Sequence, residues 1–135
     1  MDATGPDGEK KLGMNNTTGL VQVVVRHDGS VPVCEVRGEL DASNVEHVRE
    51  QIIGAAVSET PGMVIDLTDT TYLDSAGVRI LFELARRLRS RRQELRIAVP
   101  EDGIVRRVLV LTALGDVVPL ESNAADGVRA LQARV

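Results

Sequence analysis

Apolar and polar stretches alternate along the chain with two different periods. Two β-branched runs, Leu20–His27 and Val31–Gly38, flank the dipeptide Asp28-Gly29, which is typical of a hairpin turn. A third run, Met63–Leu67, is apolar almost throughout, and this favours a central strand that is buried on both faces. The two remaining strand-like runs are Leu95–Val99 and Val117–Leu120.

Between these strands the apolar residues recur at helical spacing. One helical face after residue 41 is formed by Val45, Val48, Ile52 and Ala56. Asp41, Ser43 or Asn44 can cap the start of that helix. A polar loop, Thr68–Thr71, leads toward a stronger helical pattern from Gly77, with the stripe Val78, Leu81, Phe82, Ala85 and Leu88. Two shorter helices are predicted over Asp102–Leu111 and Ala124–Val135.

The order of these elements predicts an α/β fold. Strands that alternate with helices require crossover connections, whereas the first hairpin requires an antiparallel pair. We therefore expect a mixed sheet with helices packed against it. Residues 1–18 are polar and rich in Gly, Asp, Asn and Thr, so we predict a flexible tail there and one domain over residues 19–135.

Composition narrows the classes of function. The net charge of the 135 residues is −4, which gives no reason to expect a nucleic-acid partner. The charge is uneven, because residues 79–96 hold seven arginines and only two acidic residues. Cys34 is the only cysteine and sits in an apolar run, so we expect a buried side chain and no disulfide. The sequence has no apolar stretch of membrane-spanning length, and we expect a cytoplasmic protein.

Ser75 stands where a polar stretch turns into a helical pattern, and its local chemistry leaves three interpretations open. As a nucleophile it would need a base, but Leu73-Asp74-Ser75-Ala76-Gly77 does not match the G-x-S-x-G elbow. His27 and His47 are the only imidazoles, and nothing in the sequence places either at Ser75. Their spacing also does not predict a metal site.

The second interpretation of Ser75 is structural, because Asp and Ser cap helices and Gly77 lets a helix approach a sheet closely. The third is a switch, since the N-terminus of a helix tolerates an added phosphate. Such a phosphate would join Asp74 in an acidic surface, and we expect Asp66 and Asp69 to approach from the same strand end.

Two blocks of the sequence resemble a known family. "VRGELDASNVEHVREQI" and "VIDLTDTTYLDSAGVRILFEL" are together similar to the STAS domain of bacterial anti-sigma factor antagonists, and the likeness extends over Leu20–Val135. The resemblance implies a four- to five-stranded mixed sheet with helices mainly on one face, no catalytic activity, no cofactor and no metal. It implies binding to an anti-sigma factor that is also a serine kinase, which releases a sigma factor.

The same resemblance implies that the kinase phosphorylates Ser75 and dissociates, and that a PP2C-type phosphatase reverses this. The partner-binding residues that it implies are Asp41, Asp74, Ser75, Ala76, Gly77 and Arg79. Ala76 departs from relatives that carry a hydroxyl there, so Ser75 is the only hydroxyl in its block. Two alternatives stay open: a non-switching STAS adaptor subunit of a transporter or signalling complex, and nucleotide binding near Asp41 and Asp74, for which the sequence has no phosphate loop.

Overall fold

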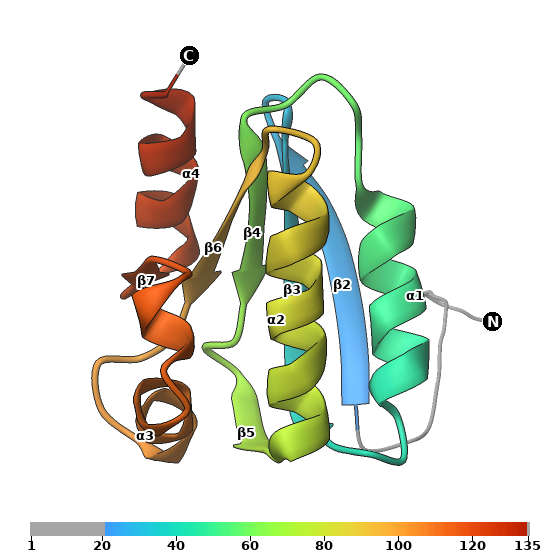
Figure 1. Cartoon of the computed structure of the whole chain (residues 1–135), viewed down its shortest axis with the longest axis vertical. Coiled ribbons are helices and arrows are strands. Elements are labelled where there is room, and N and C mark those ends of the chain that lie inside the picture. The colour runs from blue at the N-terminus through green and yellow to red at the C-terminus, as the bar shows by residue number, and fades with distance from the viewer. Residues whose placement is uncertain (1–20, 135) are drawn as a thin grey trace, which may run out of the picture.

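One mixed β-sheet runs through the part of the chain that the structure describes (Figure 1). The computed structural model describes residues 21–134, so the tail predicted over residues 1–18 lies outside the described residues and stays a prediction. Within residues 21–134 the elements are β2 (Val21–Asp28), β3 (Val31–Leu40), α1 (Val45–Ala55), β4 (Gly62–Asp66), β5 (Thr70–Leu73), α2 (Ser75–Arg89), β6 (Glu94–Ala98), α3 (Ile104–Leu111), the 3-10 turn η1 (Leu114–Asp116), β7 (Leu120–Glu121) and α4 (Ala124–Gln132).

The strand order is β2-β3-β4-β6-β7, and β5 pairs with β3 beyond the end of β4. Among the strands of residues 21–134, only β2 and β3 are antiparallel, as their Asp-Gly turn predicts, and the other pairs are parallel. All five residues of β4 are buried, which confirms the central strand expected from its apolar run. The predicted α/β fold with a mixed sheet is therefore confirmed.

The two faces of the sheet carry two hydrophobic cores. The larger core joins the sheet to α1, α2 and α3 through side chains such as Ile52, Leu81 and Leu109. The smaller core lies under α4, where Val128 and Leu131 pack on the opposite face (Figure 1). Three of the four helices in residues 21–134 thus serve one face, in agreement with the expected layout. None of the described helices has the length and apolar character that crossing a membrane requires.

The sheet has six strands within residues 21–134 rather than the four to five expected, because part of the predicted loop Thr68–Thr71 belongs to β5. The sequence does not predict this strand, because Thr70 and Thr71 are polar and lie in a stretch that is typical of a loop. The strand forms because β3 continues past β4 to Leu40 and offers β5 a partner. The register shifts between Gly38 and Glu39, and Gly38 has a φ of 100°, which glycine adopts without strain.

Several predicted element boundaries also move. The helix after the polar loop begins at Ser75 rather than Gly77, and α3 begins at Ile104 after the N-cap Gly103 rather than at Asp102. The last strand is not Val117–Leu120 but the two residues of β7, because η1 already turns the chain before Val118 enters the core.

Candidate functional site

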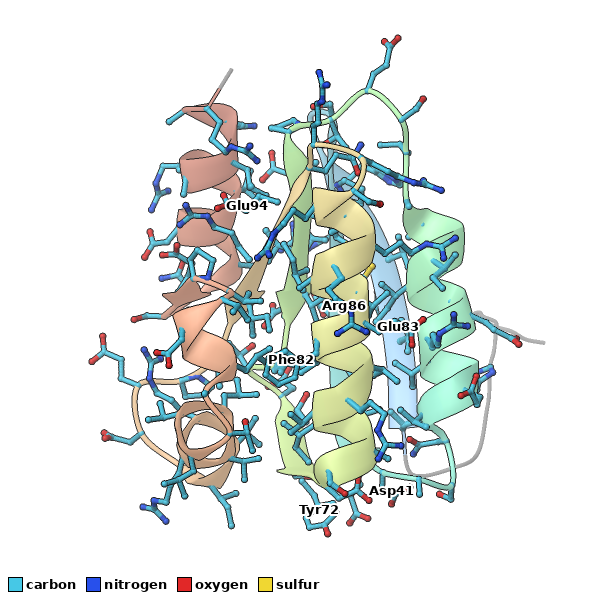
Figure 2. All side chains as sticks on the ribbon, in the orientation of Figure 1. Asp41, Tyr72, Phe82, Glu83, Arg86 and Glu94 are labelled. Carbon is cyan, nitrogen blue, oxygen red and sulfur yellow. The ribbon has the colours of Figure 1, made fainter. Side chains whose placement is uncertain are left out.

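The candidate site forms where two parallel strands end side by side. Leu40, the last residue of β3, pairs with Leu73, the last residue of β5. The Asp74 N–H donates to the Leu40 carbonyl oxygen at 3.3 Å and extends this pairing by one step. Asp41 and Asp74 therefore leave the sheet at the same edge, although they are distant in the sequence. Figure 2 shows Asp41 and Tyr72 at this end of the molecule, below the start of α2.

Asp74 connects the two segments that leave the sheet. Its Oδ1 accepts hydrogen bonds from the N–H groups of Ala76 at 2.9 Å and Gly77 at 3.1 Å, so Asp74 is the N-cap of α2. Its Oδ2 accepts a hydrogen bond from the Ala42 N–H, at 3.2 Å, in the loop between β3 and α1. One carboxylate thus holds the start of a helix and a neighbouring loop in a fixed relation.

The loop between β3 and α1 is stabilised from within by Asp41 and Asn44. Oδ1 of Asp41 accepts a hydrogen bond from the Ser43 N–H at 2.9 Å. Asn44 is only 2% exposed; its Oδ1 accepts from the Asp41 N–H at 3.1 Å and its Nδ2 donates to the Glu39 carbonyl at 2.8 Å. Asn44 is the N-cap of α1 by position, yet its side chain does not cap the helix. It secures the loop instead, a role that the capping pattern does not reveal.

Ser75 is the first residue of α2, and its side chain is exposed. The Ser75 hydroxyl forms no hydrogen bond with any other residue in 21–134, so it does not act as a cap. Ala76 beside it is half-buried, and Arg79, one turn further along α2, is exposed. The structure therefore gathers Asp41, Asp74, Ser75 and Ala76 at one end, with Arg79 on the adjoining outer face of α2.

Gly77 takes part in the site by its lack of a side chain. It is buried, and a Cβ at this position would lie 2.4 Å from Leu73 Cδ1 and 3.2 Å from Leu40 Cγ. The α2 helix can therefore begin directly on top of the two paired strand ends. The close approach that we expected of this glycine is confirmed.

Asp66 and Asp69 do not join the site in the way that we predicted. Oδ1 of Asp66 accepts hydrogen bonds from the N–H of Thr68 at 2.9 Å and from its hydroxyl at 2.7 Å. Oδ2 of Asp69 lies 4.0 Å from Nε of Arg37. Strand β5 follows both residues, and it carries the chain away to the end of β3 before Ser75 is reached. The Asp66 carboxylate thus stabilises the loop between β4 and β5, and the Asp69 carboxylate faces Arg37 on β3.

Sequence reasoning missed an exposed aromatic residue near the site and an ion pair between α1 and α2. Tyr72 on β5 is 46% exposed, an unusual environment for one of the two aromatic residues of the chain. Glu83 on α2 forms an ion pair with Arg49 of α1, whose NH2 lies 2.6 Å from Oε2. The neighbouring Arg49 guanidinium lowers the pKa of Glu83. Only the packing of α1 beside α2 reveals this pair.

The structure places the candidate reactive groups away from a catalytic arrangement at Ser75. His27 is exposed on β2, and His47 is half-buried on α1. Neither histidine is hydrogen-bonded to Ser75. Cys34 is fully buried in the larger core, and burial raises the pKa of its thiol to about 12. The buried position predicted for Cys34 is therefore confirmed.

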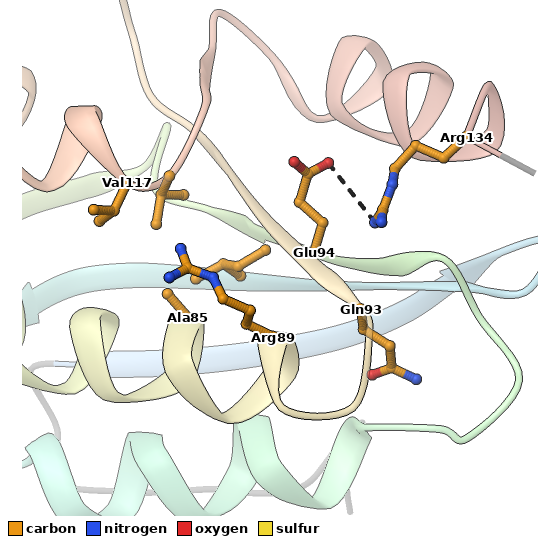
Figure 3. Close-up of a pocket in the computed structure, with 8 residues that line it drawn as sticks. Ala85, Arg89, Gln93, Glu94, Val117 and Arg134 are labelled. Atoms are coloured by element: carbon orange, nitrogen blue, oxygen red, sulfur yellow. Dashed lines mark ion pairs between the residues drawn. The ribbon is translucent and has the colours of Figure 1, made fainter.

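A pocket separate from the Ser75 site lies between the C-terminal half of α2 and β6 (Figure 3). Its volume is about 170 Å³, and its lining includes the charged residues Arg89, Glu94 and Arg134 and the apolar residues Leu95 and Val117. Arg134 NH1 lies 3.9 Å from Oε1 of Glu94, so the charge of this arginine is already compensated by an ion pair. Ligand pockets usually begin near ~300 Å³, and we therefore place the candidate site at Ser75 rather than here.

Comparison with known proteins identifies relatives of this sequence and of this fold. A family model for the STAS domain matches residues 22–127. The anti-sigma-B factor antagonist of Listeria monocytogenes is 31% identical over 87 residues, which cover 64% of this chain and 75% of that protein. The crystal structure of an anti-sigma factor antagonist from Mycobacterium paratuberculosis is 27% identical, with a TM-score of 0.75 over 86% of this chain and 97% of that one.

The fold is also that of the anti-sigma factor antagonist SpoIIAA. Its unphosphorylated form is 20% identical, with a TM-score of 0.68 over 84% of this chain and 99% of SpoIIAA. The phosphorylated form of SpoIIAA from Bacillus is 17% identical, with a TM-score of 0.57 over 82% and 99% of the two chains. Identity at this level speaks for the fold alone. Because the family model spans residues 22–127 of the 135, the chain belongs to the STAS domain family.

Proposed function

We propose that this protein is an anti-sigma factor antagonist that is switched by phosphorylation of Ser75. In its unphosphorylated form it binds an anti-sigma factor of the serine-kinase type and releases a sigma factor. The observation that carries the proposal is the exposed Ser75 hydroxyl at the first position of α2, beside a cap that Asp74 already provides. The names of the Listeria and Mycobacterium relatives support the same class of function.

The fold can accept a phosphate at Ser75 without unfolding. Asp74 already satisfies the N–H groups of Ala76 and Gly77, so the helix does not depend on the Ser75 hydroxyl. A negative charge in the first turn of a helix is itself favourable by about 0.3–1 kcal/mol. Modification therefore leaves the domain intact and changes only its surface.

The docking surface, in contrast, changes strongly. A phosphoserine carries a charge of about −1.5 to −2 at neutral pH. Asp74 is adjacent, so the phosphate makes this end of the molecule strongly acidic. A carboxylate of the partner about 6 Å from the phosphate would be repelled by roughly 3 kcal/mol per unit charge at an effective dielectric constant of about 20, before salt screening. A partner that covers this point must also desolvate the phosphate. A loss of about 1–3 kcal/mol already weakens binding about 5–150-fold.

The residues around Ser75 divide into two roles in this proposal. Asp41, Ala76 and Arg79 contact the partner from the rim around the serine. Asp74 and Gly77 set the position of Ser75, through the cap and through the close approach of α2 to the strand ends. A PP2C-type phosphatase removes the phosphate and restores binding.

Binding measurements with three variants test the proposal. The probes are the purified serine-kinase-type anti-sigma factors encoded in the source genome, each titrated at one fixed salt concentration. We expect Ser75→Ala to bind like the wild type and to resist phosphorylation, whereas Ser75→Asp binds at least tenfold more weakly. Ser58→Asp, an exposed serine in the loop between α1 and β4, controls for added charge elsewhere.

Two results would contradict the proposal. The first is equal binding by wild type and Ser75→Asp to a partner that the wild type does bind. The second is phosphate transfer by that kinase to a residue other than Ser75, found by peptide mapping of the treated protein. Stable binding of the chain to a transporter, without phosphorylation of Ser75, favours the non-switching adaptor instead.

A further inference from the structure

The short helix α3 exposes more apolar surface than its position in the fold requires. Its sequence, I-V-R-R-V-L-V-L, buries Val105 and Leu109 in the larger core. The other side is not polar: Leu111 is 78% exposed, Val110 59% and Ile104 58%. Three of the six large exposed hydrophobic residues in 21–134 therefore lie on this one helix.

Helical spacing arranges part of this surface as a stripe. Ile104, Val108 and Leu111 follow one another at i, i+4 and i+7 and share one face; we call these three residues the α3 patch. The neighbouring Arg107 is exposed and forms no ion pair within residues 21–134. Arg106, in contrast, donates to the Val99 carbonyl at 3.1 Å and holds the helix to the preceding strand.

Isolated exposed apolar residues are ordinary on protein surfaces, but a cluster of them marks an interaction site. The two ends of the α3 patch do not stabilise the domain, since Ile104 and Leu111 stay largely in water. Only half-buried Val108 packs against the core that Val105 and Leu109 help to form. Its apolar stripe and the exposed Arg107, which has no ion-pair partner among residues 21–134, instead suit a partner surface with apolar residues and an acidic rim.

The position of α3 connects this patch to the Ser75 site. Helix α3 packs against β5, the strand that ends directly before Asp74 and Ser75. Tyr72, on β5 directly before Leu73, is 46% exposed. Figure 1 shows α3, β5 and the start of α2 at the same end of the molecule.

The size of a protein interface gives an independent reason to join them. A stable interface buries about 800 Å² on each partner and takes about 20–30 residues a side. The tips of the two loops around Asp41 and Ser75 hold only a handful of exposed residues, so a partner must extend beyond them. The outer faces of α1 and α2 are mainly charged, whereas the centre of an interface is apolar. The α3 patch is the apolar surface within reach.

We propose that the α3 patch, together with Tyr72, is the second half of the surface that docks the anti-sigma factor. This inference rests on the proposed function and adds a division of labour. The α3 patch provides the constant, apolar part of the affinity, and Ser75 provides the part that phosphorylation removes. The contacting segment of the anti-sigma factor then carries apolar side chains flanked by Asp or Glu near Arg107.

The test uses substitutions at exposed positions, which leave the core intact. Leu111→Ser and Ile104→Ser are compared with Val25→Ser, a matched control at a 40% exposed valine on the edge strand β2. The probes are again the purified kinase-type anti-sigma factors of the source genome, with unfolding curves to verify each variant. We expect Leu111→Ser to weaken binding at least tenfold, Ile104→Ser several-fold, and Val25→Ser less than twofold.

The outcomes separate this inference from the function on which it rests. If the wild type binds and Ser75→Asp does not, while Leu111→Ser binds normally, the docking role of α3 is wrong and the proposed function stands. If Leu111→Ser abolishes only self-association of the chain in sedimentation, the patch serves a second copy and the inference is also wrong. If the wild type binds none of the anti-sigma factors, the proposed function fails and this inference fails with it.

Discussion

Replacing Gly77 by Ala probes the contact that sets the position of Ser75. The new methyl group would meet Leu73 Cδ1 at 2.4 Å and Leu40 Cγ at 3.2 Å, so α2 or the strand ends must shift. Overpacking of this kind costs about 1–3 kcal/mol. Ala is also the better helix former, which returns about 0.5–1 kcal/mol. We therefore expect a net loss of about 1 kcal/mol in the free energy of unfolding.

Gly54→Ala provides the matched control. Gly54 lies in α1, and a methyl group there would have no neighbouring heavy atom within 4 Å, so Ala brings only the gain in helix propensity. The difference between the two variants then isolates the clash, at about 1–3 kcal/mol. Urea unfolding followed by circular dichroism measures both. An equal gain in stability for Gly77→Ala and Gly54→Ala would refute the close approach of α2 to the strand ends.

A double variant identifies the neighbour that the methyl group meets. If Leu73 causes the clash, combining Gly77→Ala with Leu73→Ala removes most of the additional penalty, because the truncated side chain leaves room. The two effects would then be strongly non-additive, as expected for residues in contact. Additive losses would place the strain elsewhere, in the α2 backbone or at Leu40.

Three further predictions concern stability and reactivity. Asp74→Ala removes the cap of α2 and the hydrogen bond to the Ala42 N–H, so we expect a loss of about 1–2 kcal/mol in the free energy of urea unfolding and weaker partner binding. Asn123→Ala, which removes the cap of α4, is the control: we expect it to lower stability by about 1 kcal/mol without affecting binding. Arg49 lowers the pKa of Glu83 in the folded protein, so their ion pair stabilises the fold at a pH above the unfolded pKa of Glu83 and is lost as the pH falls through the folded pKa. We therefore expect Glu83→Gln to be less stable than the wild type at neutral pH. A difference in stability between the two proteins that persists at strongly acidic pH would contradict this. Burial raises the pKa of Cys34 to about 12, so iodoacetamide at pH ~8 should label it only after unfolding; rapid labelling of the native protein would disprove its burial.

The sequence predicts those elements whose stabilising contacts are local or whose pattern is long. The Asp28-Gly29 hairpin, the fully apolar Met63–Leu67 run and the stripe of α2 all have such signals, and the structure contains each of them. Strand β5 has no comparable signal, since its pairing depends on the distant end of β3 and on the bulge at Gly38. A sequence pattern cannot show where that partner ends.

The site was predictable in part for the same reason. Ser75 and Asp74 stand in a short motif, and their places at the start of α2 follow from capping chemistry. The bond from the Ala42 N–H to Asp74, the buried Asn44 and the Arg49–Glu83 ion pair each join segments through tertiary packing. The exposure of apolar residues on α3 was also not predictable, because most residues of this helix are apolar and the pattern does not show which face packs against the core.

The joining of two strand ends by Asp74 has a consequence for when the protein can be recognised. The loop after β3 and the start of α2 come together only once β3 and β5 have paired and the Ala42 N–H has found its acceptor. A chain still emerging from the ribosome, or one that has unfolded, presents the Ser75 peptide without Asp41 beside it. A kinase that reads both segments, as the proposed function requires, would act on the finished domain alone, and its phosphate would then mark a correctly assembled molecule.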